Sequence, residues 1–179
     1  MTATPADQLS LSLAGPRAGD LAGLDPKDNL VLRAAEALRR LCGVGAGAHL
    51  TLEKHLPAAG GIGGGSSDAA AALGALTALW GVSPDPTALR ALALDLGADV
   101  PVCLAAAPTR MGGIGEALSP LGSIAAAGIV LVNPGAPTPT GAVFKALAGR
   151  FSAPVEPPGP LGPDPRDLAA AVAALGNDL

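Results

Sequence analysis

Hydrophobic and polar residues alternate in two short stretches of the first third of the chain. Leucine occupies every second position of Leu9–Leu13, and His49–Lys54 shows the same period. A period of two is typical of a β-strand that buries one face. The pattern therefore predicts one strand and a loop within Met1–Pro26, and a second strand over His49–Lys54.

Elsewhere the apolar residues recur every three or four positions, which is typical of helices. Asp28 or Asn29 can cap a helix over Leu30–Cys42, and Ser66 or Ser67 can cap another that runs to Trp80. A third helix is predicted from Asp85 to Gly97, since glycine often ends helices. The residues expected to face the core from the first of these helices are Val31, Ala34, Ala35 and Leu38.

The second half of the chain mixes short strands with helices. The predicted elements are a short apolar element around Val100–Ala105, strands at Pro108–Met111, Glu116–Leu121 and Gly128–Asn133, and helices over Thr140–Leu147 and Asp167–Leu175. The strand at Gly128–Asn133 is expected to be buried because it is continuously apolar. Ser152–Pro165 contains six prolines and is interpreted as a linker or surface loop. Because strands and helices do not alternate strictly, the fold class predicted is α+β.

The stretch Pro57–Asp68 stands out because five of the six residues from Gly60 to Gly65 are glycine. Glycine weakens helices and strands but allows positive φ and close approach of a ligand to the backbone. A glycine loop that leads into a helix presents free N–H groups, here from Gly61 to Ser67, and these suit a phosphate. The loop is not a Walker A motif, since no lysine follows it, and Ser66 replaces the third glycine of G-x-G-x-x-G. The residues alone predict an anion-binding loop, with a flexible turn as the alternative.

Two charged residues, one just before the loop and one well after it, are candidates for chemistry. Asp99 follows the helix-ending Gly97, so its carboxylate lies at a turn, where it can orient or deprotonate a hydroxyl group. Alternatively, Asp99 caps the short element that begins at Val100. Lys54 precedes the loop and can neutralise a phosphate, or can simply be a solvated strand end.

Composition narrows the class of protein further. The chain is 49% hydrophobic and 2% aromatic, so its core must consist of Ala, Leu, Val and Ile. The net charge is −4 and the 11 basic residues form no run, which argues against nucleic acid or an anionic membrane as a partner. Cys42 and Cys103 are far apart and are expected to be free thiols. Met1–Asp7 lacks the pattern of a signal peptide, so a cytoplasmic protein is expected. The sequence indicates no oligomeric state.

The motifs together resemble those of the GHMP kinase superfamily. Pro57–Ala70 fits the pattern P-x-x-x-G-[LI]-G-[GS]-[GS]-S-[SA], and three more pieces fit in order: Asp28-Asn29-Leu30-Val31, Gly97–Val102 and Gly113–Glu116. The resemblance implies an ATP-dependent kinase that uses Mg²⁺ and phosphorylates an alcohol. The lead-in Lys54-His55-Leu56-Pro57 is most similar to the branch whose substrate carries cytidine diphosphate, in the non-mevalonate isoprenoid precursor pathway. The implied fold is a domain like domain 2 of ribosomal protein S5, followed by a ferredoxin-like domain.

The resemblance also implies roles for particular residues. The expected ATP-binding residues are Lys54, Pro57, Gly60, Gly61, Gly63, Gly64, Gly65, Ser66 and Ser67, and the hydroxyl of Ser66 or Ser67 can also meet the metal ion. Asp99 is the expected catalytic residue, facing the substrate hydroxyl. Thr140 and Phe144 match positions at the cytidine-diphosphate substrate, although Phe144 can instead be a core residue. Gly113, Gly115 and Glu116 are interpreted as a structural turn.

Two family segments are not found in these 179 residues: an N-terminal P-x-K-[IL]-N-L segment with a catalytic lysine, and a late glycine motif, G-[ST]-G-x-[CST]. We therefore expect residues 1–151 to be the N-terminal ATP-binding domain without its first strands, and residues 152–179 to be a linker and the start of a truncated second domain. The hypothesis is a small-molecule kinase. The alternatives are a non-catalytic nucleotide-binding remnant and a related kinase with another alcohol substrate.

Overall fold

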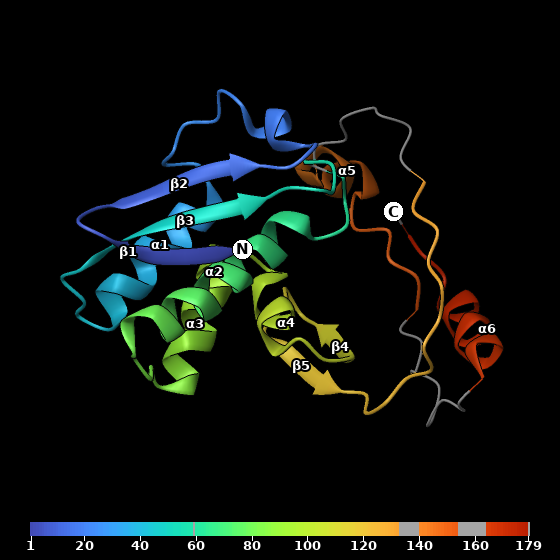
Figure 1. Cartoon of the computed structure of the whole chain (residues 1–179). Coiled ribbons are helices and arrows are strands. Elements are labelled where there is room, and N and C mark those ends of the chain that lie inside the picture. The colour runs from blue at the N-terminus through green and yellow to red at the C-terminus, as the bar shows by residue number, and fades with distance from the viewer. Residues whose placement is uncertain (59, 133–139, 154–163, 179) are drawn as a thin grey trace. The chain divides into compact units, whose positions relative to one another are not determined.

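The computed structural model describes residues 1–58, 60–132, 140–153 and 164–178 (Figure 1). The elements in chain order are β1 (Thr2–Ala6), β2 (Leu9–Ala14), η1 (Ala18–Leu21), α1 (Leu30–Leu41), β3 (Gly47–Glu53), α2 (Gly64–Trp80), α3 (Pro86–Leu96), α4 (Val100–Ala105), β4 (Thr109–Gly112), β5 (Ala117–Pro120), α5 (Thr140–Leu147) and α6 (Pro165–Leu175). The chain divides into two compact units, which are residues 1–106 with 111–118, and residues 107–110 with 119–179. The α+β class is confirmed.

The first unit contains a three-stranded sheet with the order β1-β3-β2. The central strand β3 pairs antiparallel with β1 and parallel with β2, and Leu50 lies opposite Ala3 on one side and Leu11 on the other. The prediction of a single strand before Pro26 was wrong, because β1 also forms. Its alternation is weak and it contains Pro5, a residue that sheets tolerate on an edge strand such as this one.

Helices α1 and α2 pack against the sheet and enclose the core (Figure 1). The four α1 residues expected to face inward are all buried, and they meet Leu50 and Leu52 of β3 and Leu73 and Leu76 of α2. Alanine supplies much of the α2 surface in this core, namely Ala69, Ala70 and Ala72. Small side chains allow close approach of helix and sheet, so a core almost without aromatic residues can still be dense.

The helix boundaries follow from capping, with one correction. Asn29 caps α1 by accepting from the Val31 N–H at 3.0 Å, and Asp85 caps α3 by accepting from the Ala88 N–H at 2.9 Å. The prediction that Ser66 or Ser67 caps α2 was wrong. The helix begins at Gly64, and Gly63 is its N-cap with a φ of 69°. Glycine reaches this left-handed conformation at little cost, so the helix starts two residues before Ser66, the nearest side chain suited to capping.

The second unit departs most from expectation. The buried strand predicted at Gly128–Asn133 was wrong: residues 128–132 have no regular structure, and 88% of Val132 is exposed. An apolar run forms a buried strand only when neighbouring strands pair with it, and none of the described strands does so. The helix over Thr140–Leu147 is confirmed as α5, and the last helix as α6.

Several predictions lie beyond what the structure tests. The domain boundary at residue 151, the ferredoxin-like second domain and the cytoplasmic location stay predictions, and residues 154–163 of the expected linker lie outside the described residues. Among the described helices, none combines the length and apolar character needed to cross a membrane.

Replacement of a buried leucine on α1 tests this core. We expect Leu38→Ala to lower the free energy of unfolding by about 2–5 kcal/mol, because a fully buried side chain leaves a cavity. Leu41→Ala on the same helix is the control, since Leu41 is 41% exposed, and it should lose less than about 1 kcal/mol. Urea unfolding followed by circular dichroism measures both. Equal losses would contradict this description of the α1 face.

Candidate phosphate-binding site

The first turn of α2 is the centre of the candidate site. Its first backbone N–H that pairs within the helix belongs to Ser67, which donates to the Gly63 carbonyl at 2.9 Å. No side chain of the described part of the chain caps the turn, so the N–H groups of Gly64, Gly65 and Ser66 have no partner within it. The helix dipole adds roughly half a positive charge at this end. Free donors and a positive end together favour an anion such as a phosphate.

The loop before α2 contacts η1, the first helical element of the chain. The Ala58 N–H donates to Asp20 at 3.1 Å, and Asp20 also pairs with Arg17 at 3.2 Å. Pro57, Gly60, Gly63, Gly64 and Ser66 are half-buried, whereas Gly61, Gly65 and Ser67 are exposed. The Ala58 end of the loop is therefore tied to η1, and part of the backbone from Gly61 to Ser67 is open to a ligand.

Asp99 faces this loop from the start of α4. Its carboxylate oxygen Oδ2 lies 3.9 Å from the point where a Cβ on Gly63 would stand, so the two segments nearly touch. Asp99 occupies the N-cap position of α4, but its side chain makes no capping hydrogen bond. The alternative that the Asp99 side chain caps α4 is therefore not supported. The half-buried carboxylate is left available beside the first turn of α2.

Lys54 is buried, so the interpretation as a solvated strand end was wrong. Its side chain is 5% exposed, and Nζ lies 2.5 Å from Oδ2 of Asp68. Nζ also lies 3.4 Å from the point where a Cβ on Gly64 would stand, directly beside the first turn of α2. A buried ammonium group needs a partner, and Asp68 supplies it. Lys54 thus adds positive charge beneath the loop while Asp68 keeps the site from being strongly cationic.

The role of Asp68 was missed in the sequence. A lysine that ends a buried strand requires a nearby anion, and Asp68 is the first acidic residue after the glycine loop. Neither alternative considered for Lys54, a phosphate neighbour or a solvated strand end, called for a carboxylate partner. The hydrogen bond from Ala58 to Asp20 was also missed, and no local pattern marks it, because the two residues are 38 positions apart.

A small cavity adjoins the loop. It has a volume of about 190 Å³, and Lys54, Gly65 and Asp68 form one wall. The other lining residues are Leu21, Leu24, Asp28, Asn29, Leu30, Val31, Leu52 and Ala58. The lining thus combines apolar side chains with four polar or charged ones, Asp28, Asn29, Lys54 and Asp68. The segment Asp28–Val31 therefore caps α1 and also borders the candidate site.

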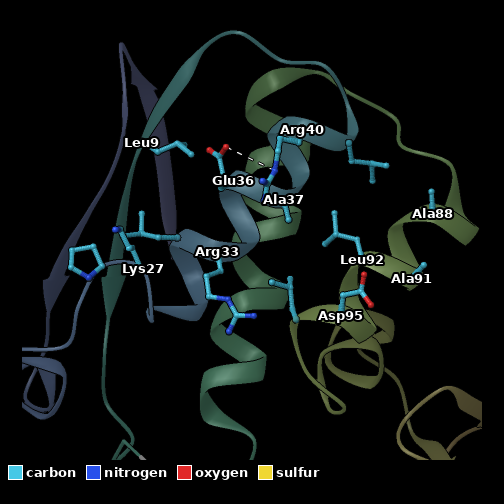
Figure 2. Close-up of a pocket in the computed structure, with 14 residues that line it drawn as sticks. Leu9, Lys27, Arg33, Glu36, Ala37, Arg40, Ala88, Ala91, Leu92 and Asp95 are labelled. Carbon is cyan, nitrogen blue, oxygen red and sulfur yellow. Dashed lines mark ion pairs between the residues drawn. The ribbon is translucent and has the colours of Figure 1, made fainter.

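A larger cavity of about 990 Å³ lies elsewhere on the same unit, between the outer faces of α1 and α3. Figure 2 shows Arg33, Glu36 and Arg40 of α1 on one side and Leu92 and Asp95 of α3 on the other. None of the site residues predicted from the sequence lines it. Its charges are mixed: Lys27, Arg33 and Arg40 lie in its lining together with Glu36 and Asp95, and Glu36 pairs with Arg39 and Arg40 of its own helix.

The substrate residues predicted in the second unit both lie on α5. Thr140 begins this helix, and Phe144 follows four residues later with 52% of its surface exposed. An exposed phenylalanine is not a core residue, so the alternative role for Phe144 is not supported. For a metal ion, the described residues contain no group of three His, Cys, Asp or Glu side chains that could hold it. The hydroxyl of Ser66 or Ser67 stays the predicted protein ligand.

Cys42 and Cys103 are both free thiols, as predicted. Cys103 lies one helical turn after Asp99, and its N–H donates to the Asp99 carbonyl at 3.1 Å. Burial raises the pKa of the Cys103 thiol, and the negative charge of Asp99 raises the pKa further. The thiol therefore reports on the position of the Asp99 carboxylate.

Comparison with known proteins finds a family model that matches the segment containing these features. Residues 29–107, which include the Asn29 cap, the glycine loop and Asp99, match the family model described as the GHMP kinases N terminal domain. This segment is similar to the N-terminal domain of GHMP kinases. The match agrees with the motifs from which the resemblance was inferred, and with the mixed α and β content of the first unit.

Relatives with curated names point in the same direction. The chain is 51% identical to a 4-diphosphocytidyl-2-C-methyl-D-erythritol kinase of Paramagnetospirillum magneticum, with 98% of the chain and 60% of the relative covered. It is 52% identical to the protein of the same name from Parvibaculum lavamentivorans, with 100% of the chain and 62% of the relative covered. A crystal structure of a 4-(cytidine 5'-diphospho)-2C-methyl-D-erythritol kinase is similar, with a TM-score of 0.64, 32% identity and coverage of 97% of this chain and 56% of that one. The chain thus spans about 60% of the length of the relatives it matches.

Removal of the Asp68 charge tests the buried ion pair. We expect Asp68→Asn to lower the free energy of unfolding by about 2–3 kcal/mol, because Lys54 then has no anionic partner. This is less than for a fully enclosed pair, since the Asp68 side chain is 21% exposed. The double variant Lys54→Met, Asp68→Asn should recover most of the loss. Glu36→Gln, which breaks a surface pair with Arg39, is the control and should cost less than about 1 kcal/mol. Lys54→Met alone completes the set. If the double variant lost the sum of the losses of Asp68→Asn and Lys54→Met, the two side chains would not be coupled.

The pKa of Cys103 offers a second test. The rate of alkylation by iodoacetamide depends on the thiolate, so its pH midpoint should lie above that of the unfolded protein, because the folded-state pKa is raised. Asp99→Asn should lower this midpoint by removing the nearby negative charge. A Cys42→Ser background restricts the reaction to Cys103. An unchanged midpoint in Asp99→Asn would place the carboxylate away from the thiol.

Proposed function

We propose that the protein transfers the γ-phosphate of ATP to the 2-hydroxyl of 4-diphosphocytidyl-2-C-methyl-D-erythritol, a step of the non-mevalonate isoprenoid precursor pathway. The observation that carries the proposal is the carboxylate of Asp99 facing the uncapped first turn of α2 across Gly63. Phosphoryl transfer needs a cradle for the nucleotide phosphates and a group that orients the attacking hydroxyl. These two parts stand next to each other here. The names of the relatives supply the substrate.

In this proposal the phosphates of ATP bind to the N–H groups of Gly64, Gly65 and Ser66, and its base occupies the small cavity beside Lys54. The base has apolar walls there, and Lys54 lies close enough to the loop to add favourable charge. Mg²⁺, when bound, neutralises charge on the phosphates, and Ser66 or Ser67 would hold it through a hydroxyl group. Thr140 and Phe144 would bind the cytidine end of the substrate, the aromatic ring by stacking.

Asp99 acts on the acceptor. Its carboxylate accepts a hydrogen bond from the substrate hydroxyl and takes its proton as the hydroxyl oxygen bonds to the γ-phosphorus. The bond from the γ-phosphorus to the bridging oxygen of ADP breaks, and ADP leaves. Asp68 partly offsets the charge of Lys54, so the backbone donors of the first turn of α2 are the main groups that meet the transferred phosphoryl group.

An ADP-release assay with ATP, Mg²⁺ and 4-diphosphocytidyl-2-C-methyl-D-erythritol tests the proposal. We expect turnover in the wild type, and a loss of about 100-fold or more in kcat for Asp99→Asn with little change in the KM for ATP. Asp95→Asn is the matched control, since Asp95 is an exposed acid on the preceding helix, and it should retain activity. Equal turnover in Asp99→Asn would remove Asp99 from this role.

The same assay with a panel of alcohols, combined with a thermal-shift measurement, separates the two alternatives. Stabilisation by ATP without ADP release from any alcohol would identify a nucleotide-binding remnant. ADP release only with another alcohol would identify a different substrate. Either result contradicts the proposed reaction.

A further inference from the structure

The turn between β4 and β5 touches the segment that carries Asp99. Gly115 in this turn is buried and has a φ of 111°. A Cβ at Gly115 would overlap the carbonyl oxygen of Ala98, the residue before Asp99. The contact is between two backbones, so only a glycine allows it.

The turn is fixed by its own hydrogen bonds. The Gly115 N–H donates to the Gly112 carbonyl at 3.1 Å, and the Ile114 N–H donates to Oε2 of Glu116 at 2.7 Å. The Glu116 carboxylate lies over Gly113, where any Cβ would overlap it. Gly113 has a φ of 65°, so two glycines and one glutamate together define the shape of the turn. Such a turn presents a rigid surface to Ala98.

Asp99 needs a support of this kind. Within the described residues, no hydrogen bond holds its carboxylate. Its position must therefore come from the backbone on either side. On the C-terminal side, Val100 is fully buried in the core, and its N–H donates to the Gly97 carbonyl at 3.0 Å. On the N-terminal side, Gly115 packs against Ala98.

We propose that the turn Gly112–Glu116 is a positioning element that holds the Ala98–Asp99 backbone, so that the Asp99 carboxylate faces the first turn of α2. The inference rests on the proposed function for the role of Asp99, but the contact that it invokes is independent of activity. Glu116 acts through Gly115, and Gly115 acts through Ala98; neither is a catalytic residue. The interpretation of Gly113, Gly115 and Glu116 as only a structural turn is thereby extended.

Gly115→Ala tests the proposal, because the added methyl group must displace Ala98 or the turn. We expect kcat in the ADP-release assay to fall by about 10- to 100-fold with the KM for ATP within about twofold, since a displaced carboxylate impairs transfer and leaves the nucleotide site intact. Gly43→Ala is the matched control. Gly43 also has a positive φ, of 63°, but a Cβ there has no neighbour within 4 Å, so this variant carries the backbone strain without the contact and should keep its kcat.

A second readout does not depend on activity. In the Cys42→Ser background, Gly115→Ala should shift the pH midpoint of Cys103 alkylation, and the shift should disappear when Asp99→Asn is also present. If the shift persists without the Asp99 carboxylate, Gly115 acts on the burial of Cys103 and the proposal is overturned. If a folded Gly115→Ala variant keeps both the wild-type kcat and the wild-type midpoint, the proposal is also overturned. Failure of the proposed function would remove only the kinetic readout.

Glu116→Gln is a second variant that tests the same proposal if Gly115→Ala does not fold. It keeps the size of the side chain and weakens the hydrogen bond from the Ile114 N–H, so the turn should loosen without a clash. We expect a smaller decrease in kcat and a smaller shift of the Cys103 midpoint, both in the same direction as for Gly115→Ala. No change in either quantity would contradict a role for the turn.

Discussion

The uncapped first turn of α2 is the constraint on which the rest of the site depends. A helix normally satisfies its first N–H groups with a side chain, and the serines next to this helix are good candidates for that task. Here Gly63 takes a left-handed conformation and starts the helix at Gly64, so both serines fall inside it. The N–H groups of the first turn are thereby left for a ligand. The glycine run is what makes this early start possible.

The buried charge next to this turn follows from the same geometry. β3 ends at Glu53. The side chain of the following residue, Lys54, is buried, and its ammonium group lies beside Gly64. Asp68 on α2 balances it at 2.5 Å. The pair ties the end of the central strand to the helix, so the sheet, the loop and α2 keep one arrangement. Asp99 and the turn at Gly115 then complete the other side of the site.

Much of this arrangement could be predicted from local patterns in the sequence. The apolar spacing and a cap at Asp28 or Asn29 predicted α1, and the glycine run predicted a loop that leads into α2 with exposed backbone. The features that the sequence analysis missed depend on contacts between segments that are distant in the sequence. The burial of Lys54, its pairing with Asp68 and the contact of Gly115 with Ala98 arise from tertiary packing, which no short-range period encodes. The apolar run at 129–132 resembles a buried strand, but a strand also needs a neighbour, and pairing cannot be inferred from one run alone.

The central claim is that the first turn of α2, and not the larger cavity between α1 and α3, binds the phosphates of a nucleotide. The most direct test is a titration of ¹⁵N-labelled protein with a non-hydrolysable ATP analogue and Mg²⁺, followed by amide chemical shifts. The account predicts that the largest changes occur at Gly64, Gly65 and Ser66, with smaller changes at residues lining the cavity beside Lys54. Changes confined to Arg33, Arg40 and the facing residues of α3 would contradict it.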